Sequence, residues 1–315
     1  MKIVYLGTPE IAVPSLEYFI KKPDIEVQLV ITQPDRPAGR GHKLIPPPVK
    51  VLAETYNIPV SQPGLIRKDP ELVEKLKKLE PDAFIMVAFG QILSKELLDI
   101  PKIGTINLHS SLLPAYRGAN PIQWAVINGD KISGITTMLS DPGVDTGAML
   151  LKKEIEIPDD MDAAELSEIM AHTGPEMLYE SLMRLADKSI TPVAQDDSLA
   201  TYAPKLSKED GNINWNRKAI EIHNQIRGMK PWPSAYTCFK GNQIKINQSF
   251  VNNKEMINQV KTGEIIGIMD SGIGVVTGDG ILIIKQLQPA GKKAMDAASW
   301  YNGARIQKGE LFQSG

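Results

Sequence analysis

The sequence contains almost no cysteine and no long apolar run. Its 315 residues include a single cysteine, Cys238, so the chain cannot form an internal disulfide or a cysteine-based zinc site. No stretch of about 18 apolar residues is present, which excludes an ordinary membrane-spanning helix. The first residues lead straight into strand-like sequence, with neither a signal peptide nor an arginine-rich transit segment. These absences predict a protein of the cytoplasm.

Several motifs that mark common enzyme classes are also missing. The chain has no Gly-Lys-Ser/Thr of a P-loop, no Gly-x-Ser-x-Gly nucleophile elbow and no Gly-x-Gly-x-x-Gly after its first strand-like run. The four histidines are too far apart for the HExxH motif. These observations argue against a P-loop enzyme, a serine hydrolase of the usual form and a nicotinamide-dependent enzyme, and we expect no metal.

The composition is that of an ordinary folded protein, with 42% hydrophobic and 23% charged residues. At roughly 150 residues per domain, the length predicts about two domains. The net charge of −2 is unevenly spread: residues 1–207 carry 21 Lys and Arg against 28 Asp and Glu, whereas residues 208–315 carry 14 against 9. A basic excess of this size indicates either a polyanionic partner or an ordinary solvated surface.

The first half alternates short β-branched runs with helical patterns, which is typical of a parallel sheet covered by helices. The pattern predicts strands at 2–6, 27–32, 83–88, 103–108 and 135–139 with a short one near 60, and helices at 11–20, 49–56, 70–78, 121–127 and within 158–185. We therefore expect an α/β fold with a Rossmann-like, doubly wound, mostly parallel sheet. The segment 33–48 interrupts this alternation, because its proline and glycine content predicts an irregular loop.

The second half of the chain has a different sequence pattern. Residues 187–204 are typical of a linker, and a helix at 219–227 is followed by short strands separated by glycine-rich turns. These strands are predicted at 235–239, 244–247, 263–269, 274–277 and 281–287, a spacing typical of a small β-barrel. The expected domains are a catalytic domain at 1–189, a linker at 190–207 and a C-terminal domain at 208–315.

Two segments bring polar side chains toward one edge of the predicted sheet. Asn107 and His109 lie two residues apart on a strand, so their side chains point to the same side. Asp145 lies in a turn after the strand at 135–139, which we expect to end at the same edge. An amide donor, a titratable imidazole and a carboxylate suit acyl transfer through an oxyanion. The alternative is a hydrogen-bonded structural histidine and a turn-forming aspartate.

These residues also belong to longer motifs. Asn107-x-His109 is followed by Ser111-Leu112-Leu113-Pro114-x-Tyr116-Arg117-Gly118, and Gly143-Val144-Asp145-Thr146-Gly147 lies downstream. Together they resemble the folate-dependent formyltransferases. Further matches at 7–10, 32–41, 121–123, 202–205, 231–233 and 291–295 extend the resemblance along essentially the whole chain. They are similar to the branch that formylates the methionine on initiator tRNA.

This resemblance implies formyl transfer from 10-formyltetrahydrofolate to the α-amino group of methionine on initiator tRNA, with no metal. Asn107 and a protonated His109 would stabilise the oxyanion, while Asp145 would favour the imidazolium and help to relay the proton. The folate co-substrate would contact two stretches of chain. These are Ser111, Leu112, Leu113 and Pro114, and the pocket wall of Val87, Ala88, Phe89, Gly90 and Ile92. For Val87 and Ala88, simple core packing is an equal alternative.

The same resemblance assigns the long loop and the basic C-terminal domain, expected to be an OB-like barrel, to tRNA binding. The candidates are Arg36, Arg40, Lys43, Lys205, Arg227, Lys230, Lys292 and Lys293, each of which is alternatively an ordinary surface residue. We expect the enzyme to act as a monomer. Two rival interpretations remain: a formyltransferase acting on a small amine, and an RNA-binding protein on an inactive scaffold.

Overall fold

A computed structural model of the chain describes residues 1–38, 43–252 and 260–314. They form two compact units. The first unit comprises Met1–Gly118, Ser133–Ile155 and Ser167–Tyr202, and the second comprises Ala119–Ile132, Glu156–Leu166 and Ala203–Gly315. No helix within the described residues is long and apolar enough to cross a membrane.

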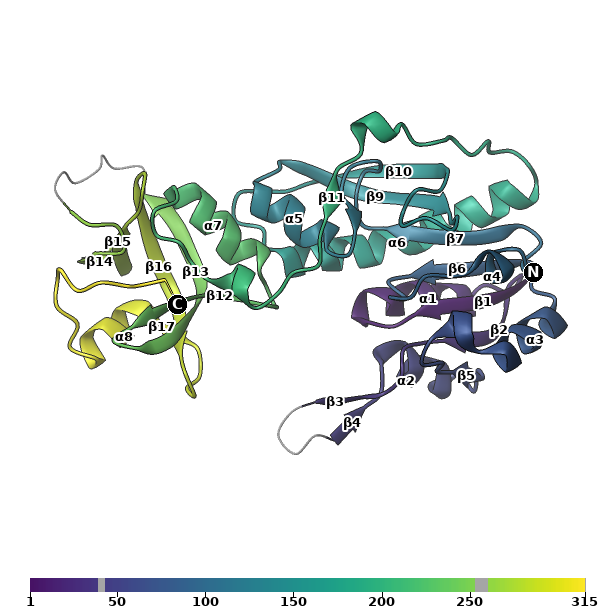
Figure 1. The fold of residues 1–315 in the computed structure, drawn as a ribbon, viewed down its shortest axis with the longest axis horizontal. Helices are drawn as coiled ribbons and strands as arrows, with labels where there is room; N and C mark the ends of the chain where they lie inside the picture. Colours follow the sequence, from purple (N-terminus) through teal and green to yellow (C-terminus); the bar gives the residue numbers. More distant parts are fainter. Residues whose placement is uncertain (39–42, 253–259, 315) are drawn as a thin grey trace. The chain divides into compact units, whose positions relative to one another are not determined.

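The first unit is built on a seven-stranded sheet in the order β10-β9-β7-β6-β1-β2-β5 (Figure 1). Its strands are β1 (Lys2–Gly7), β2 (Glu26–Ile31), β5 (Val60–Ser61), β6 (Ala83–Val87), β7 (Gly104–His109), β9 (Ile132–Leu139) and β10 (Met149–Glu156). Strands β5, β2, β1, β6 and β7 pair in parallel, and β9 runs antiparallel to β7. This confirms the predicted mostly parallel, Rossmann-like sheet.

The central strands have the apolar sequence that a sheet covered on both faces requires. In β1 the side chains from Ile3 to Leu6 are fully buried, and so are Phe84 and Ile85 in β6. Among these side chains only Tyr5 carries a polar group, and its hydroxyl donates to the Ala12 carbonyl at 2.6 Å. Burial strongly raises the pKa of this phenol, so Tyr5 stays neutral and hydrogen-bonded in the core.

The helices of the first unit are α1 (Val13–Ile20), α2 (Pro48–Thr55), α3 (Pro70–Leu79), α4 (Lys95–Leu98) and, from Ser167 on, α6 (Ala163–Ala186). All but α4, which the sequence missed, were predicted from their periodicity. Helix α3 illustrates why they form where they do: its first residue is a proline, and the Asp69 carboxylate accepts the Leu72 N–H at 3.0 Å. Its face of Leu72, Val73 and Leu76 is buried in the core beside the sheet.

The segment 33–48 corrects one prediction, because part of it is regular. Strands β3 (Arg36–Ala38) and β4 (Lys43–Ile45) form an antiparallel pair, with Arg36 opposite Ile45. Figure 1 shows the pair extending away from α2. Pro37 is tolerated because a strand in a two-stranded ribbon has a free side that needs no N–H donor. The ends of the loop therefore pair despite their proline content.

The second unit contains an antiparallel sheet in the order β12-β13-β16-β15-β14, with β17 beside β16. Its strands are β12 (Ala235–Phe239), β13 (Asn242–Asn252), β14 (Ile265–Met269), β15 (Gly272–Val276), β16 (Ile281–Pro289) and β17 (Met295–Asp296). Cys238 of β12 forms a bridge with Gln313, and Glu264 forms one with Leu311. The C-terminal segment therefore connects the two edges of the sheet, as expected for a small barrel. The sequence missed β17 and helix α8 (Ala297–Gly303).

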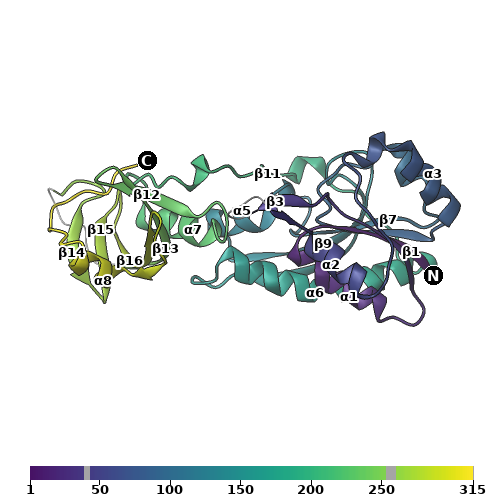
Figure 2. The ribbon, with the colours of Figure 1, turned by 90° about the horizontal axis from the view of Figure 1, so that it is seen from below.

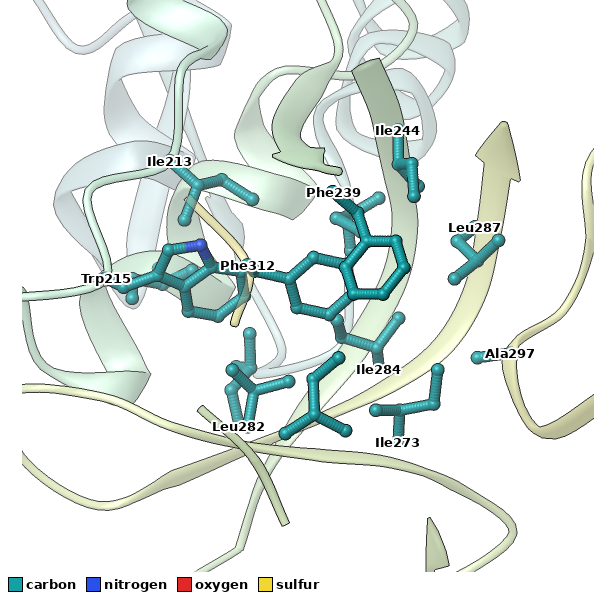
Figure 3. Close-up of a cluster of buried hydrophobic side chains, with 14 of the residues drawn as sticks. Ile213, Trp215, Phe239, Ile244, Ile273, Leu282, Ile284, Leu287, Ala297 and Phe312 are labelled. Atoms are coloured by element: carbon teal, nitrogen blue, oxygen red, sulfur yellow. The ribbon is translucent and has the colours of Figure 1, made fainter. Parts of the chain in front are cut away.

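An aromatic cluster fills the core of this antiparallel domain (Figure 3). Phe312 stacks on Trp215 with ring centroids 5.7 Å apart, and Phe239 meets Phe312 edge-on at 5.7 Å. Helix α7 (Ala219–Gly228) lies along β13, and α8 lies beside β15 and β16 (Figure 2). Because rings near the C-terminus complete this core, the barrel depends on the last residues of the chain.

Helix α5 (Pro121–Asn128) also belongs to the second unit and packs against α7. A Cβ on Gly228 would lie 2.5 Å from the Ile127 side chain, so only glycine allows this close approach of the two helices. Trp124 contributes a hydrogen bond from its indole N–H to the Pro204 carbonyl, at 2.8 Å. The second unit is therefore assembled from segments that are distant in the sequence.

Candidate active site

The candidate site begins at the carboxyl end of β7. Asn107 and His109 point to the same side of this strand, as predicted, and each is only 6% exposed. His109 is the last residue of β7, and its neighbour β6 ends at the same edge because the two strands are parallel. Carboxyl edges of such sheets are where α/β proteins bind their ligands.

Both ring nitrogens of His109 face oxygen atoms. Nε2 lies 2.9 Å from the Tyr116 carbonyl oxygen, and Nδ1 lies 3.6 Å from Oδ1 of Asp145. A carbonyl and a carboxylate can only accept, whereas a neutral imidazole carries one N–H. Only a doubly protonated ring can therefore direct a proton to both oxygens. His109 therefore lies between two acceptors, one of which is the Asp145 carboxylate.

Asp145 reaches His109 by a route that differs from the prediction. Because β9 runs antiparallel to β7, its last residue Leu139 lies opposite Ile106, and the Ser140 N–H donates to the Thr105 carbonyl. Strand β9 thus ends toward the amino end of β7, and the expectation that it ends at the same edge is wrong. Instead the chain from residue 140 folds back on itself to bring Asp145 to His109.

Specific contacts hold this return loop, residues 140–148. The Gly118 N–H donates to Oδ2 of Asp145 at 2.9 Å. Asp141 accepts from the Thr146 hydroxyl at 2.7 Å, and the Leu139 N–H donates to the Ala148 carbonyl at 2.9 Å. A Cβ on Gly147 would lie 1.7 Å from the Leu139 carbonyl oxygen, so glycine is required for the loop to fold back this closely.

The Asn107 amide completes the polar set. Its side chain is buried, and it has no hydrogen-bond partner in the part of the chain that the structure describes. Asn107 can therefore donate to an oxyanion that develops beside His109.

The stretch 111–114 forms a tight turn after β7. The Ser111 hydroxyl donates to the Ala115 carbonyl at 2.5 Å, and its own carbonyl accepts from the Thr136 hydroxyl at 2.7 Å. Leu113 is fully buried, and its carbonyl accepts from Lys152. Leu112 and Pro114 are half-buried. Ser111 and Leu113 thus shape the turn, and Leu112 and Pro114 are the accessible members of the predicted folate contact.

The predicted pocket wall divides in the same way. Val87 and Phe89 are 2% exposed, so they pack in the core. Ala88 and Gly90 are exposed, and Ile92 is 51% exposed although it is apolar. These three residues follow β6 at its carboxyl end and present apolar surface there. Such surface fits one face of an aromatic ligand ring.

The predicted tRNA contacts also fall into groups. Arg36 is exposed on β3, and Lys43 lies in β4. Arg40 lies outside the described residues. Lys205, Lys292 and Lys293 are exposed.

Arg227 and Lys230 are engaged inside the second unit. Arg227 is only 4% exposed, and its guanidinium donates to Oδ1 of Asn224 at 3.0 Å and to the Met161 carbonyl at 2.9 Å. Burial lowers the pKa of Arg227. The Lys230 ammonium pairs with Asp162 at 3.0 Å. These two cations therefore hold the unit together and are not presented as free surface charges.

Sequence reasoning missed Thr136, which ties the turn at 111–115 to β9, and Gln195, which contacts the return loop. Gln195 lies in the segment expected to be a linker, where no periodic pattern marks it. Arg117, which contacts Gln195, lies within the motif at 111–118, and this motif was the only sequence feature that marked it. No group of three or more metal-ligating side chains occurs among residues 1–38, 43–252 and 260–314.

Two family models match the chain. The model described as formyl transferase matches residues 1–182, and the model described as formyl transferase, C-terminal domain, matches residues 205–305. Curated relatives match over nearly their whole length. A methionyl-tRNA formyltransferase of Clostridium tetani is 49% identical over 313 residues, which are 99% of this chain and 100% of the relative. One of Clostridium novyi is 48% identical over 307 residues, 98% of each chain.

Solved structures share the fold. The N-formyltransferase of Helicobacter canadensis, in complex with folinic acid and dTDP-3-aminofucose, matches with a TM-score of 0.66 and 22% identity. The match covers 90% of this chain and 98% of that one. At this identity the comparison bears on the fold alone.

Proposed function

The chain belongs to the formyl transferase family, and we propose that it transfers a formyl group from 10-formyltetrahydrofolate to the α-amino group of methionine on initiator tRNA. The product would serve translation initiation. One observation carries the proposal: relatives named for this activity match both units at 46–49% identity over almost their full length. The name of these relatives, at an identity more than twice that of the sugar N-formyltransferase, favours a tRNA acceptor over a small amine.

The family supports a folate-derived formyl donor, and the bound folinic acid of the Helicobacter canadensis relative agrees with it. The donor supplies an activated formyl carbonyl. Ala88, Gly90 and Ile92, which follow β6, and Leu112 and Pro114, which follow β7, are the accessible residues of this chain that fit a pterin ring. Val87, Phe89, Ser111 and Leu113 support them from within.

The chain's own groups act on charge and protons. When the neutral methionine amine attacks the formyl carbon, the carbonyl oxygen becomes an oxyanion that the Asn107 amide and the protonated His109 stabilise. Collapse of this intermediate breaks the bond to the folate nitrogen, and the proton lost by the amine moves to that nitrogen. His109 and Asp145 support this transfer as a charge-balanced pair. A low exposure of 6% at both Asn107 and His109 keeps water from weakening these interactions.

The tRNA-binding surface is proposed to include the exposed cations Arg36, Lys205, Lys292 and Lys293, together with Arg40 and Lys43 on the resemblance alone. Phosphate contacts of this kind add affinity without reading sequence. We assign catalysis to residues 1–189, a connecting role to 190–207 and tRNA binding to 208–315. The proposed setting is the cytoplasm, with the enzyme acting as a monomer.

The direct test mixes the purified full chain with 10-formyltetrahydrofolate and methionyl initiator tRNA, and follows formylmethionine released from the tRNA by mass spectrometry. We expect formylation that requires both donor and charged tRNA, with none on free methionine or uncharged tRNA. Absence of transfer to the charged tRNA in the presence of donor would overturn the proposal.

A further inference from the structure

The segment after α6, residues 190–202, is bound to the first unit along its length. Val193 and Met149 of β10 exchange backbone hydrogen bonds of 2.8 and 2.9 Å, and the Arg117 N–H donates to the Thr201 carbonyl at 2.8 Å. Neither family model covers this segment, since one ends at residue 182 and the other begins at 205. We refer to residues 190–202 as the strap.

Gln195 is the strap residue that meets the return loop. Its Nε2 donates to the Asp145 carbonyl and to the Gly147 carbonyl, both at 2.8 Å. The side-chain amide has two N–H donors, so both are used on this one turn. The half-buried Gln195 therefore fixes the backbone on each side of Thr146, directly at the residue whose carboxylate faces His109.

Arg117 fixes Gln195 in turn. It is 3% exposed, and its Nε donates to Oε1 of Gln195 at 3.0 Å. Because a guanidinium can only donate, this contact orients the amide so that its NH2 group faces the two carbonyls. The other arm of Arg117 donates to Asp197 at 2.7 Å. The next residue, Gly118, holds the Asp145 carboxylate itself.

We propose that Gln195 is a positioning residue for formyl transfer, acting through Asp145. The carboxylate has the Gly118 N–H as one anchor, and Gln195 supplies the second anchor by holding the turn that carries it. Asp145 also has a left-handed backbone, with φ of 55°, which a loosened turn would not keep. A displacement of about 1 Å at a reacting group can cost about 10²-fold in rate. This inference rests on the proposed role of the His109–Asp145 pair.

The test compares three variants of the full chain. Gln195→Glu keeps the side-chain length and the acceptor for Arg117 but replaces both donors to the turn. We expect kcat to fall about 10-fold to 100-fold, with KM for donor and for tRNA within about twofold of the parent values. Gln195→Met, which removes all three hydrogen bonds, should give a loss at least as large. Asp197→Asn is the matched control: its side chain is 84% exposed and touches the same arginine, so kcat should stay within about twofold.

If Gln195 only stabilised the fold, the loss of kcat in Gln195→Glu would not depend on the presence of Asp145. In an Asp145→Ala background, Gln195→Glu should lower kcat by less than about twofold further, since the group that it positions is gone. Hydrogen exchange gives a second readout that needs no activity. The Gly118 amide, which donates to Asp145, should exchange faster in Gln195→Glu, as in Asp145→Ala, and at the parent rate in Asp197→Asn.

Failure of the positioning role and failure of the proposed function give different results. If the parent is active and the folded Gln195 variants keep the parental kcat, the positioning role is overturned. It is also overturned if Gln195→Glu lowers kcat as much in the Asp145→Ala background as in the parent. Unchanged Gly118 exchange in both Gln195 variants would overturn it as well. A parent that transfers no formyl group to Met-tRNA would overturn the proposed function, and the exchange measurement would still decide whether Gln195 holds the turn.

Discussion

Two oxygen atoms face the ring nitrogens of His109, one from the backbone and one from a side chain of the return loop. The Tyr116 carbonyl fixes one ring nitrogen at 2.9 Å, and the Asp145 carboxylate faces the other at 3.6 Å. Neither oxygen can donate a proton, so the ring is surrounded by acceptors. The Asn107 amide lies on the same side of β7, so two polar side chains are available there to stabilise the oxyanion of the proposed reaction.

The first prediction concerns this pair. His109→Ala and Asp145→Ala should each lower turnover by at least about 10²-fold, while folate affinity changes little, because both act on the developing charge and the proton. Single-turnover formyl transfer and a donor titration measure the two quantities. His172→Ala, at an exposed position on α6, is the control and should keep parental turnover. Near-normal turnover in either site variant would contradict the assignment.

The positions of the candidate site residues were easier to predict from the sequence than the contacts that hold them. Asn107 and His109 follow from strand alternation, which is a local property. Asp145 was expected at the correct place for the wrong reason, because the direction of β9 depends on its partner strand and not on its own residues. Gln195 has no local signature at all, since its contacts with the return loop lie 48 and 50 residues away in the chain and its contact with Arg117 lies 78 residues away.

At the scale of elements, the return loop is the part on which the site depends most. Gly147→Ala would place a methyl group 1.7 Å from the Leu139 carbonyl oxygen, so the loop would have to open. We predict a loss of about 1–3 kcal/mol in the free energy of unfolding, together with reduced kcat. Denaturant unfolding and turnover check both.

Gly64→Ala is the matched control for this substitution. A Cβ there meets no atom within 4 Å, so stability and kcat should stay close to the parent values. A Gly147→Ala enzyme with parental stability and turnover would show that the loop tolerates a side chain, against the geometry.

A half-buried histidine makes the second unit sensitive to pH. His223 on α7 contacts the Ser249 hydroxyl and the Asp159 carbonyl, each at 3.1 Å. Burial is the main cause that lowers the pKa of His223, with the nearby Arg227 acting in the same direction and Asp159 and Asp160 opposing it. The unfolded chain therefore binds this proton first as pH falls. Stability is fully present above about pH 6.5 and is lost as pH falls toward the folded-state pKa.

The corresponding prediction uses His223→Gln, which cannot titrate. The parent should lose more stability between pH 7.5 and pH 5.5 than this variant does, as measured by denaturant unfolding at the two pH values. His172→Gln serves as the control and should keep the parental difference, because His223 is intact. If the parent and His223→Gln lose equal stability over this pH range, His223 does not contribute to the pH dependence of stability.

Elements with strong periodicity were predictable, and edge elements were not. The buried strands β1, β2 and β6 and the amphipathic helix α3 match their predicted ranges closely, because burial on defined faces leaves a pattern. Strand β10 is half-exposed and carries charged residues at 152–154, so it lacked such a pattern. The pairing of β3 with β4 was hidden by prolines that a two-stranded ribbon accepts.

At the scale of the whole molecule, the two units are not two consecutive halves of the chain. The second unit includes α5, whose Ile127 packs in a buried cluster with Leu206 and Met229. Removing residues 208–315 would expose that apolar surface, so such a truncation tests folding as much as tRNA binding. Charge substitutions on exposed residues are the cleaner probe of binding.

The exposed lysines of the second unit give that probe. Lys292→Glu with Lys293→Glu should weaken tRNA binding and reduce the slope of log affinity against log salt by about 2, if both contact phosphates. Affinity measured by filter binding across a salt series checks this. Lys78→Glu, exposed near the end of α3 at the amino edge of the sheet, should leave the slope unchanged. An unaltered slope in the double variant would remove these two lysines from the interface.

The choice of acceptor by the intact chain tests the proposed function. With 10-formyltetrahydrofolate as donor, transfer rates to methionyl initiator tRNA, glycinamide ribonucleotide and an amino sugar nucleotide are compared in parallel. We expect transfer to the charged tRNA alone. Transfer to a small amine with none to the tRNA would leave Asn107, His109 and Asp145 as a formyl-transfer site and contradict the role given to the basic surface.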